Sequence, residues 1–136
     1  MPSLTIQLAD LQGGGPLLEA RVVGRAPSRD ARKPVAPVTV TAMLDTGSST
    51  TVLKDTLIEA LGLEPVGRVL VSTAGHQVDC FEFAVRIVLQ KGVEFNIRAL
   101  ALPMRGQSIE CLIGRDILAK SVLIWLGLQN QFTISV

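Results

Sequence analysis

Apolar and polar residues alternate along most of the chain, with the period of two that is typical of β-strands with one buried face. Short runs rich in Val, Ile and Phe are separated by Gly, Pro and small polar residues, which is the pattern of strands joined by turns. The predicted strands are residues 3–8, 17–24, 38–44, 66–73, 77–89, 93–102, 109–114, 122–127 and 131–136. The sequence has no βαβ alternation, so it predicts an all-β fold with minor helix.

Helical spacing of apolar residues occurs in residues 55–63, DTLIEALGL. Thr56 and Glu59 have the spacing of a capping box, and Gly62 is placed to end the helix. Residues 115–120, RDILAK, are compatible with one further helical turn.

The chain length of 136 residues fits a single domain, residues 1–136, with a buried core. Residues 25–37 contain three prolines and four cationic residues, and they are predicted as an exposed hairpin loop because the flanking pieces are too short to fold alone.

The net charge of +1 and the aromatic content of 4% argue against a nucleic-acid partner. The N-terminus lacks the basic and apolar regions of a secretion signal, and no apolar run reaches the roughly 18 residues of a spanning helix. We therefore expect a soluble, cytoplasmic protein with no nucleic-acid or membrane partner.

Cys80 and Cys111 are the two cysteines, and buried free thiols are their expected state in a cytoplasmic chain. The single histidine, His76, and the absence of a CxxC pair argue against a zinc site. The sequence therefore predicts no metal and no cofactor.

The predicted strand over residues 38–44 runs into a carboxylate, in the segment MLDTGSSTTVL. After Asp45, a turn through Thr46 and Gly47 allows backbone N–H groups to point at the carboxylate, because Gly permits close approach and Thr supplies a hydroxyl. Such a loop would hold an acid rigidly. An ordinary turn with Ser and Thr caps before the helix is the simpler explanation of the Asp-Thr-Gly triplet alone, so the context of the triplet decides between the two.

A second segment, CLIGRDIL at residues 111–118, follows the predicted hairpin. Together the two segments resemble, in the same order, the two signatures of retropepsin-like aspartic proteases. The resemblance covers residues 17–136 and is nearest to the bacterial and cellular single-domain members, because Ser48 and Asp116 stand where many viral enzymes have Ala and Asn. It implies an all-β, retropepsin-like acid protease fold, a closed, barrel-like β domain with a flap hairpin and one or two short helices.

The resemblance also implies roles for individual residues. The implied catalytic residues are Asp45, the acid; Thr46, which would hydrogen-bond across a two-fold axis; and Gly47, which would offer its backbone to the carboxylate and the substrate. The implied substrate-binding residues are Ser48, Ser49, the flap tip Ala74, Gly75 and His76, and Leu112, which would face the cleft while Cys111 and Ile113 face away. Structural support of the loop is implied for Gly114, Arg115 and Asp116.

Several positions leave alternatives open. Ser49 replaces an aspartate that in retroviral members pairs with the arginine of the second signature, so Arg115 is expected to bind a main-chain carbonyl or an acid of the other subunit. Ser48 either places its hydroxyl near the outer carboxylate oxygen, where it favours the ionised form, or is only a small residue of a tight turn. The chain has no Tyr, so the pepsin-type flap tyrosine is missing, and His76 is either an exposed turn residue or a substrate contact.

Peptide hydrolysis by carboxylates needs two of them sharing one proton, one to activate water and one to protonate the carbonyl oxygen. The chain has one Asp-Thr-Gly and is too short for two lobes, so the second carboxylate has to come from a second copy, most simply in a C2 homodimer with its axis beside Asp45. The strand over residues 131–136 is expected at or near the dimer interface, because an uncovered apolar edge would favour aggregation. The predicted function is an aspartic endopeptidase that cleaves extended, hydrophobic segments of peptide or protein substrates.

Two other functions are compatible with the sequence. A non-catalytic retropepsin-fold module for dimerisation or peptide binding would keep Asp45 without cleaving a substrate. An unrelated β-barrel with a chance Asp-Thr-Gly would form no dimer centred on Asp45.

Overall fold

The computed structural model describes residues 2–25 and 36–136. The hairpin loop predicted over residues 25–37 therefore lies, for residues 26–35, outside the described part. The described strands are β1 (Ser3–Gln7), β2 (Leu17–Gly24), β3 (Val38–Leu44), β4 (Val52–Lys54), β5 (Gly67–Thr73), β6 (His76–Val88), β7 (Glu94–Leu102), β8 (Cys111–Ile113), β9 (Val122–Leu126) and β10 (Gln131–Ser135). The described helices are α1 (Leu11–Gly14), α2 (Asp55–Leu61) and α3 (Arg115–Leu118), with short 3-10 helices η1 (Gln90–Gly92) and η2 (Gly127–Gln129).

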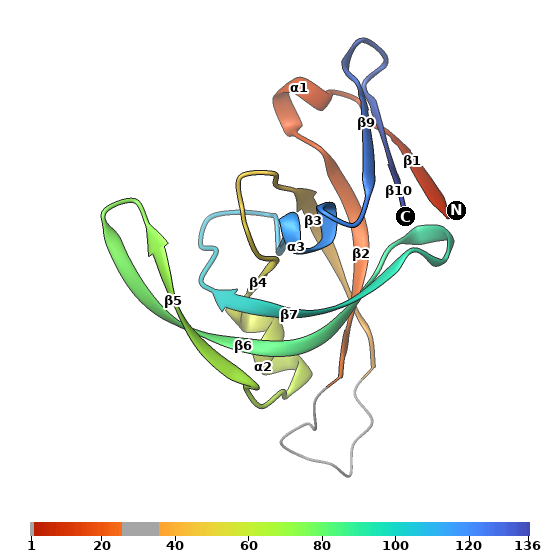
Figure 1. Cartoon of the computed structure of the whole chain (residues 1–136). Coiled ribbons are helices and arrows are strands. Elements are labelled where there is room, and N and C mark those ends of the chain that lie inside the picture. The colour runs from red at the N-terminus through yellow and green to blue at the C-terminus, as the bar shows by residue number, and fades with distance from the viewer. Residues whose placement is uncertain (1, 26–35) are drawn as a thin grey trace.

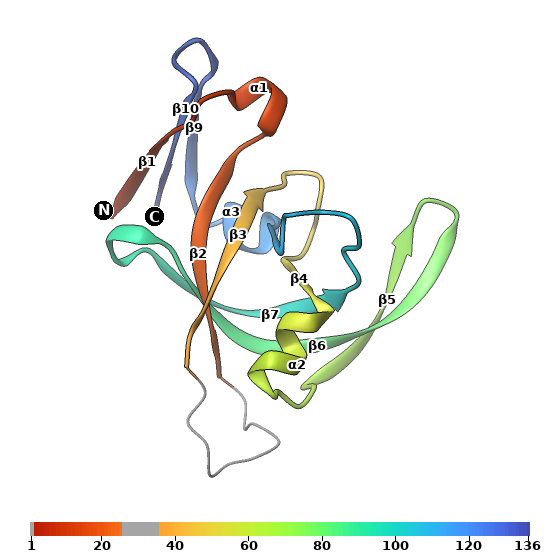
Figure 2. The same ribbon diagram turned by 180° about the vertical axis from the view of Figure 1, so that it is seen from behind.

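Most strands belong to one sheet that closes on itself. The strand order is β2-β3-β8-β4-β7-β6-β5. Because β2 also pairs with β6, the strands from β2 to β6 in this order form a closed ring. β5 pairs only with the first half of β6, and this hairpin projects from the ring on the side away from β1 (Figure 1). Figure 2 shows the same arrangement from behind. The prediction of an all-β, closed, barrel-like domain is confirmed.

The core follows the alternation that the sequence displays. In β2, Leu18, Ala20 and Val22 are buried while the intervening Glu19 and Arg21 are exposed. The second half of β6 buries every second residue in the same way. Each fully buried Leu, Val or Ile side chain stabilises the fold by about 1.5–3 kcal/mol. The hydrophobic pattern of the strands is therefore sufficient to decide which face of the sheet points inward.

Helix α2 confirms the predicted helix but begins differently. Gly62 ends it in the left-handed conformation, with φ 61° and ψ 31°, and its N–H bonds the carbonyls of Glu59 and Ile58. The predicted capping box is wrong, because Lys54 is the N-cap residue and has no side-chain cap bond. Strand β4 runs straight into the helix, since the Lys54 N–H still bonds the Glu110 carbonyl at 2.9 Å, so Thr56 already lies within the first turn.

Helix α1 and strand β4 were not predicted, and neither were the 3-10 helices η1 and η2. Helix α1 begins after Asp10, whose Oδ1 accepts the Gly13 N–H at 2.9 Å, although Gly13 to Gly15 resemble a chain break in the sequence. With α1 the described residues contain three short α-helices rather than one or two. Strand β4 is the second unpredicted element, because its three residues are too few to show a period. None of the helices in the described residues has the length and apolar character needed to cross a bilayer.

A second sheet joins the two ends of the chain. Its order is β1-β10-β9, with both pairings antiparallel. Strand β10 is therefore the central strand, with Phe132 and Ile134 fully buried, and it is not the uncovered edge that the sequence suggested for residues 131–136. The open edges of this sheet belong to β1 and β9. Deleting β10 would remove core side chains, so such a deletion would test folding rather than association.

Candidate active site

The loop that carries Asp45 joins two strands that are not neighbours. Strand β8 lies between β3 and β4, parallel to β3 and antiparallel to β4. The chain must therefore cross the end of β8 on its way from β3 to β4, and residues 45–51 form this crossing. The crossing starts from a fixed point, because the Asp45 N–H donates to the Ile113 carbonyl at 2.9 Å.

The Asp45 carboxylate is held by its own loop. The Gly47 N–H donates to Asp45 Oδ1 at 2.9 Å, and the Ser48 N–H donates to the Asp45 carbonyl at 3.2 Å. Asp45 is half-buried, so its carboxylate is oriented and still open to the cavity beside it. The Ser48 hydroxyl donates to the Thr50 carbonyl at 2.6 Å, which agrees with a small residue in a tight turn rather than with a donor to the carboxylate.

Thr51 and Asp116 tie the far end of the loop to α3. The Thr51 N–H and hydroxyl donate to the two carboxylate oxygens of Asp116 at 3.0 and 2.7 Å. Thr51 Oγ1 in turn accepts the Gly114 N–H at 3.1 Å. Thr51 is fully buried, so these bonds satisfy polar groups that water cannot reach.

Gly114 is needed because the loop passes very close to it. A Cβ at Gly114 would lie 2.5 Å from the Thr50 carbonyl carbon and 2.9 Å from the Thr51 nitrogen, which are backbone atoms that cannot move aside cheaply. The next residue continues the contact, since the Arg115 N–H donates to the Ser48 carbonyl at 2.8 Å and Arg115 Nη1 to the Thr46 carbonyl at 2.7 Å. Of the two partners expected for Arg115, the structure contains the main-chain carbonyl.

A cavity of about 600 Å³ lies between this loop and the β5–β6 hairpin. Its lining residues come from the loop, the hairpin and the neighbouring sheet: Asp45, Gly47, Ser48, Ser49, Thr50, Val52, Val69, Leu70, Val71, Ser72, Glu82, Leu100, Leu102 and Leu112. Leu112 thus faces the cavity, whereas Cys111 and Ile113 are fully buried in the core, as the alternation predicted.

Some predicted site residues lie outside this cavity wall. Thr46 is exposed at the loop surface, and Ala74, Gly75 and His76 form the exposed tip of the hairpin, beyond its lining residues. Gly114, Arg115 and Asp116 lie behind the loop. Thr51 and Glu82 were not predicted from the sequence. Thr51 is a polar residue that leads into an apolar run, which is a weak signal. Glu82 precedes the buried alternation of Phe83, Val85 and Ile87 in the opposite phase, so in the sequence it resembles a solvent-facing residue and leaves no signal.

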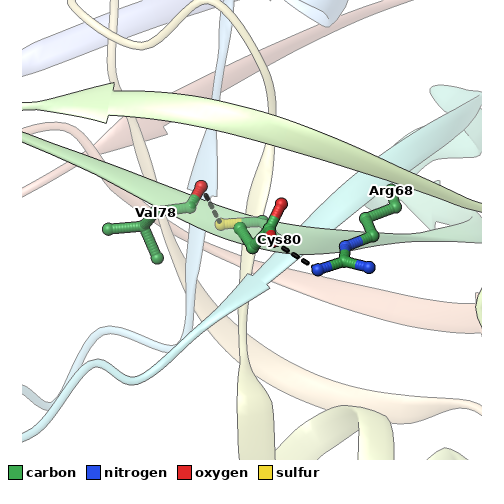
Figure 3. Close-up of polar contacts among 4 residues, drawn as sticks. Arg68, Val78 and Cys80 are labelled. Atoms are coloured by element: carbon green, nitrogen blue, oxygen red, sulfur yellow. Dashed lines mark hydrogen bonds and ion pairs between the residues drawn. The ribbon is translucent and has the colours of Figure 1, made fainter.

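The β5–β6 hairpin has two different faces. Its outward side carries an ion pair between Arg68 and Asp79, with the Arg68 guanidinium carbon 5.9 Å from the ring centre of Phe81. Its inward side carries Cys80, whose thiol donates to the Val78 carbonyl at 3.8 Å. Figure 3 shows Arg68 and Cys80 in this hairpin. The tip is a turn in which Gly75 has φ 81°, a conformation that favours Gly.

Both cysteines are free, buried thiols. Burial raises the pKa of the Cys111 thiol to about 12, with a smaller contribution from the nearby Asp116 charge. Burial and, to a lesser extent, Asp79 also raise the pKa of the Cys80 thiol. Neither thiol is therefore activated as a nucleophile. Within the described part of the chain, no three side chains among His, Cys, Asp and Glu are grouped to hold a metal ion.

Comparison with known proteins points to one family. The sequence profile described as aspartyl protease matches residues 35–117. A retropepsin-like aspartic protease from Rickettsia conorii has a similar structure, with 17% identity, a TM-score of 0.58, and coverage of 97% of this chain and 90% of that chain. The EIAV protease, solved with the inhibitor HBY-793, has 21% identity, a TM-score of 0.54 and coverage of 83% and 93%. The simian foamy virus protease has 16% identity, a TM-score of 0.51 and coverage of 76% and 91%. No curated protein sequence matches the chain.

Proposed function

Because the chain belongs to the aspartyl protease family and has the retropepsin fold, we propose that it is a homodimeric aspartic endopeptidase in which two Asp45 carboxylates activate a water molecule. The observation that carries the proposal is the Asp45 carboxylate itself, oriented by the Gly47 N–H on the wall of a cavity of about 600 Å³. Each chain, residues 1–136, would supply one half of the active site.

The proposed chemistry needs both carboxylates and one proton. One carboxylate removes a proton from the bound water while the water oxygen bonds to the scissile carbonyl carbon, and the other carboxyl group donates its proton to the carbonyl oxygen. The carboxyl group that took the proton from water then donates it to the amide nitrogen, the C–N bond breaks, and a hydroxyl proton of the intermediate returns to the other carboxylate. In this proposal Thr46, exposed beside the loop, hydrogen-bonds to the partner's loop and keeps the two acids in register.

The substrate would lie extended between the loop and the hairpin. Half of the lining residues are aliphatic, with Val52, Val69, Leu100 and Leu112 among them, which favours apolar side chains of the substrate. Ser48 and Ser49 would contact the substrate from the loop side. Ala74, Gly75 and His76 at the hairpin tip would cover it, and the substrate backbone would add to the hairpin as a further strand.

The β9 edge supports the proposed dimer. On one face of the β1-β10-β9 sheet, β9 exposes Val122, Ile124 and Leu126, whereas the paired residues on β10 are polar. An exposed apolar stripe on an open edge strand favours association with another strand. We propose that this edge meets its symmetry mate, so that the same contact completes the active site and covers the stripe.

Cleavage of an unfolded protein substrate tests this function. Activity is measured between about pH 4 and 7, where a carboxylate pair sharing a proton can operate, at several enzyme concentrations. Wild type is compared with Asp45→Asn and with Asp55→Asn, a matched substitution at the start of α2. We expect Asp45→Asn to abolish cleavage, Asp55→Asn to retain it, and the specific activity of wild type to rise with enzyme concentration as dimers form.

Two outcomes would overturn the proposal. Activity that survives Asp45→Asn would place the chemistry elsewhere. Inert wild type that nevertheless forms a folded dimer would favour the non-catalytic binding module.

A further inference from the structure

Charge is unevenly distributed in the cavity beside Asp45. Among the described residues that line it, Asp45 and Glu82 are the charged ones, and both are acids. Asp45 has the catalytic role proposed above. Glu82 lies on β6, outside the Asp45 loop and outside both sequence signatures, so neither explains why an acid faces a wall in which half of the residues are aliphatic.

Glu82 belongs to a row of residues that crosses the floor of the cavity. Strand pairing places Glu82 opposite Leu100, Leu100 opposite Val52, and Val52 opposite Leu112. These four residues share one face of the sheet, and all four line the cavity. Because side chains alternate between faces along a strand, Glu82 points toward the cavity, as do its row neighbours, whereas the adjacent Phe81 points outward.

The other neighbour of Glu82 leaves space for its carboxylate. Gly67 is the residue opposite Glu82 on β5, and a Cβ at Gly67 would lie 3.1 Å from Glu82 Oε2. The carboxylate therefore lies over a position that has no side chain. Only 19% of the Glu82 side chain is exposed, so it is partly shielded from water, and a charge that reaches it would interact more strongly than at the open surface.

Arg98 does not neutralise this carboxylate fully. Its Nη1 lies 3.6 Å from Glu82 Oε2, which is longer than a hydrogen bond. The Arg98 side chain is 67% exposed and is not part of the cavity wall, so water screens the arginine side of this ion pair. An ionised carboxylate has room for several donors, so Glu82 retains the capacity to accept a bond from a cation inside the cavity.

We propose that Glu82 makes one subsite of the cleft selective for a cationic side chain, Lys or Arg, of the peptide substrate. This inference rests on the proposed function and refines it: the remaining wall favours apolar side chains, and one position of the substrate is basic. An ammonium or guanidinium group placed at Glu82 forms a charge-assisted hydrogen bond. An acidic side chain at the same position is repelled by both Glu82 and the Asp45 pair.

A peptide series with one variable position tests the inference. The peptides share an apolar core and carry Lys, uncharged norleucine or Glu at each of the positions flanking the cleaved bond. At one position wild type should favour Lys over norleucine by about tenfold in kcat/KM, the effect expected of a single charge-assisted bond that is partly open to water. Glu82→Gln should reduce this ratio to near one, and Glu82→Lys should favour the Glu peptide.

The matched control is Arg98→Gln, which removes the ion-pair partner outside the cavity. It should preserve or increase the Lys preference, because the freed carboxylate interacts with the substrate alone. The preference should also weaken as salt is raised. A Lys-to-norleucine ratio that is the same in wild type and Glu82→Gln, or a preference lost in Arg98→Gln but kept in Glu82→Gln, would overturn the inference.

Failure of this inference is distinguishable from failure of the proposed function. Binding of the same peptides to Asp45→Asn is measured by fluorescence anisotropy, which requires no cleavage. If wild type cleaves nothing but Asp45→Asn binds the Lys peptide more tightly than the norleucine peptide, the Glu82 subsite stands and the protease proposal fails. If wild type cleaves every peptide at the same rate and binding shows no preference, the protease proposal stands and the Glu82 subsite fails.

Discussion

Thr51 is a polar residue with no exposed surface, and the reason lies in the loop it ends. Its hydroxyl donates to Asp116 and accepts the Gly114 N–H, while its own N–H bonds the second oxygen of Asp116. These bonds fix the end of the Asp45 loop against β8 and α3. The position of the Asp45 carboxylate therefore depends on a residue that takes no part in the proposed chemistry.

Replacing Thr51 with Val, at constant side-chain shape, tests how much these hydrogen bonds contribute to stability. The substitution leaves the buried Gly114 N–H without its acceptor and takes one donor from Asp116, so we expect the free energy of unfolding to fall by about 1–3 kcal/mol. Urea denaturation at fixed protein concentration measures the change. Thr51→Ser, which keeps the hydroxyl, should recover most of the loss, and Thr39→Val at an exposed position of β3 should be close to neutral. Equal stability of Thr51→Val and wild type would show that the network contributes nothing.

The residues of the candidate site differ in how far the sequence alone predicts their roles. Asp45 and Gly47 stand out because the motif places an acid and a glycine where a turn can bond its own carboxylate. Leu112 follows from alternation along a short strand. Thr51 and Glu82 acquire their roles only from strand register, since the first depends on the passage of the loop over β8 and the second on a pairing between β6 and β7. A single sequence contains no direct record of such long-range pairing.

At the scale of elements, the β1-β10-β9 sheet shows why the edge strands of a sheet are hard to predict from sequence. The alternation in β10 correctly indicates a strand with one buried face, but it does not predict which strands pair with β10. Pairing with β1 and β9 makes β10 central, and the large apolar side chains left exposed in this sheet are those of β9, with Val122, Ile124 and Leu126 on one face and Trp125 on the other. The edge proposed for the dimer is therefore β9, and the position of residues 131–136 at or near an interface stays a prediction.

Substituting Ile124 with Lys tests the β9 edge. A charge in the middle of the apolar stripe would have to be buried in the proposed dimer, so we expect the dissociation constant to rise by at least about tenfold. Sedimentation velocity over a range of concentrations measures it. Thr5→Lys adds the same charge to the same face of the sheet on β1, across β10 from Ile124, and should leave association unchanged. Loss of the dimer in Thr5→Lys alone would assign the interface to the opposite edge.

For the whole molecule, the closed ring of strands accounts for the stability of one chain, and the proposed dimer accounts for a complete active site. The ring, built by pairing of β2 with β6, stabilises one chain and holds one Asp45 at the edge of the cavity. It cannot bring a second Asp45 there, because the chain contains one such motif. Activity in this scheme is a property of the pair of chains, and folding is a property of each chain.

Mixing subunits separates these two properties. In this experiment an equal amount of Asp45→Asn is added to wild-type enzyme at a concentration where it is fully dimeric, and the subunits are allowed to exchange. If every active site needs one Asp45 from each chain, total activity should fall to about half. Random pairing leaves half of the wild-type chains in mixed dimers, which are inactive. A large excess of the variant should suppress activity almost completely. The control is the double variant Asp45→Asn with Ile124→Lys, which should lower wild-type activity much less at the same amount, because its weaker association keeps most of it out of the dimer. Activity unaffected by any amount of the single variant, under conditions where exchange is demonstrated by labelled subunits, would mean that one chain carries a complete active site.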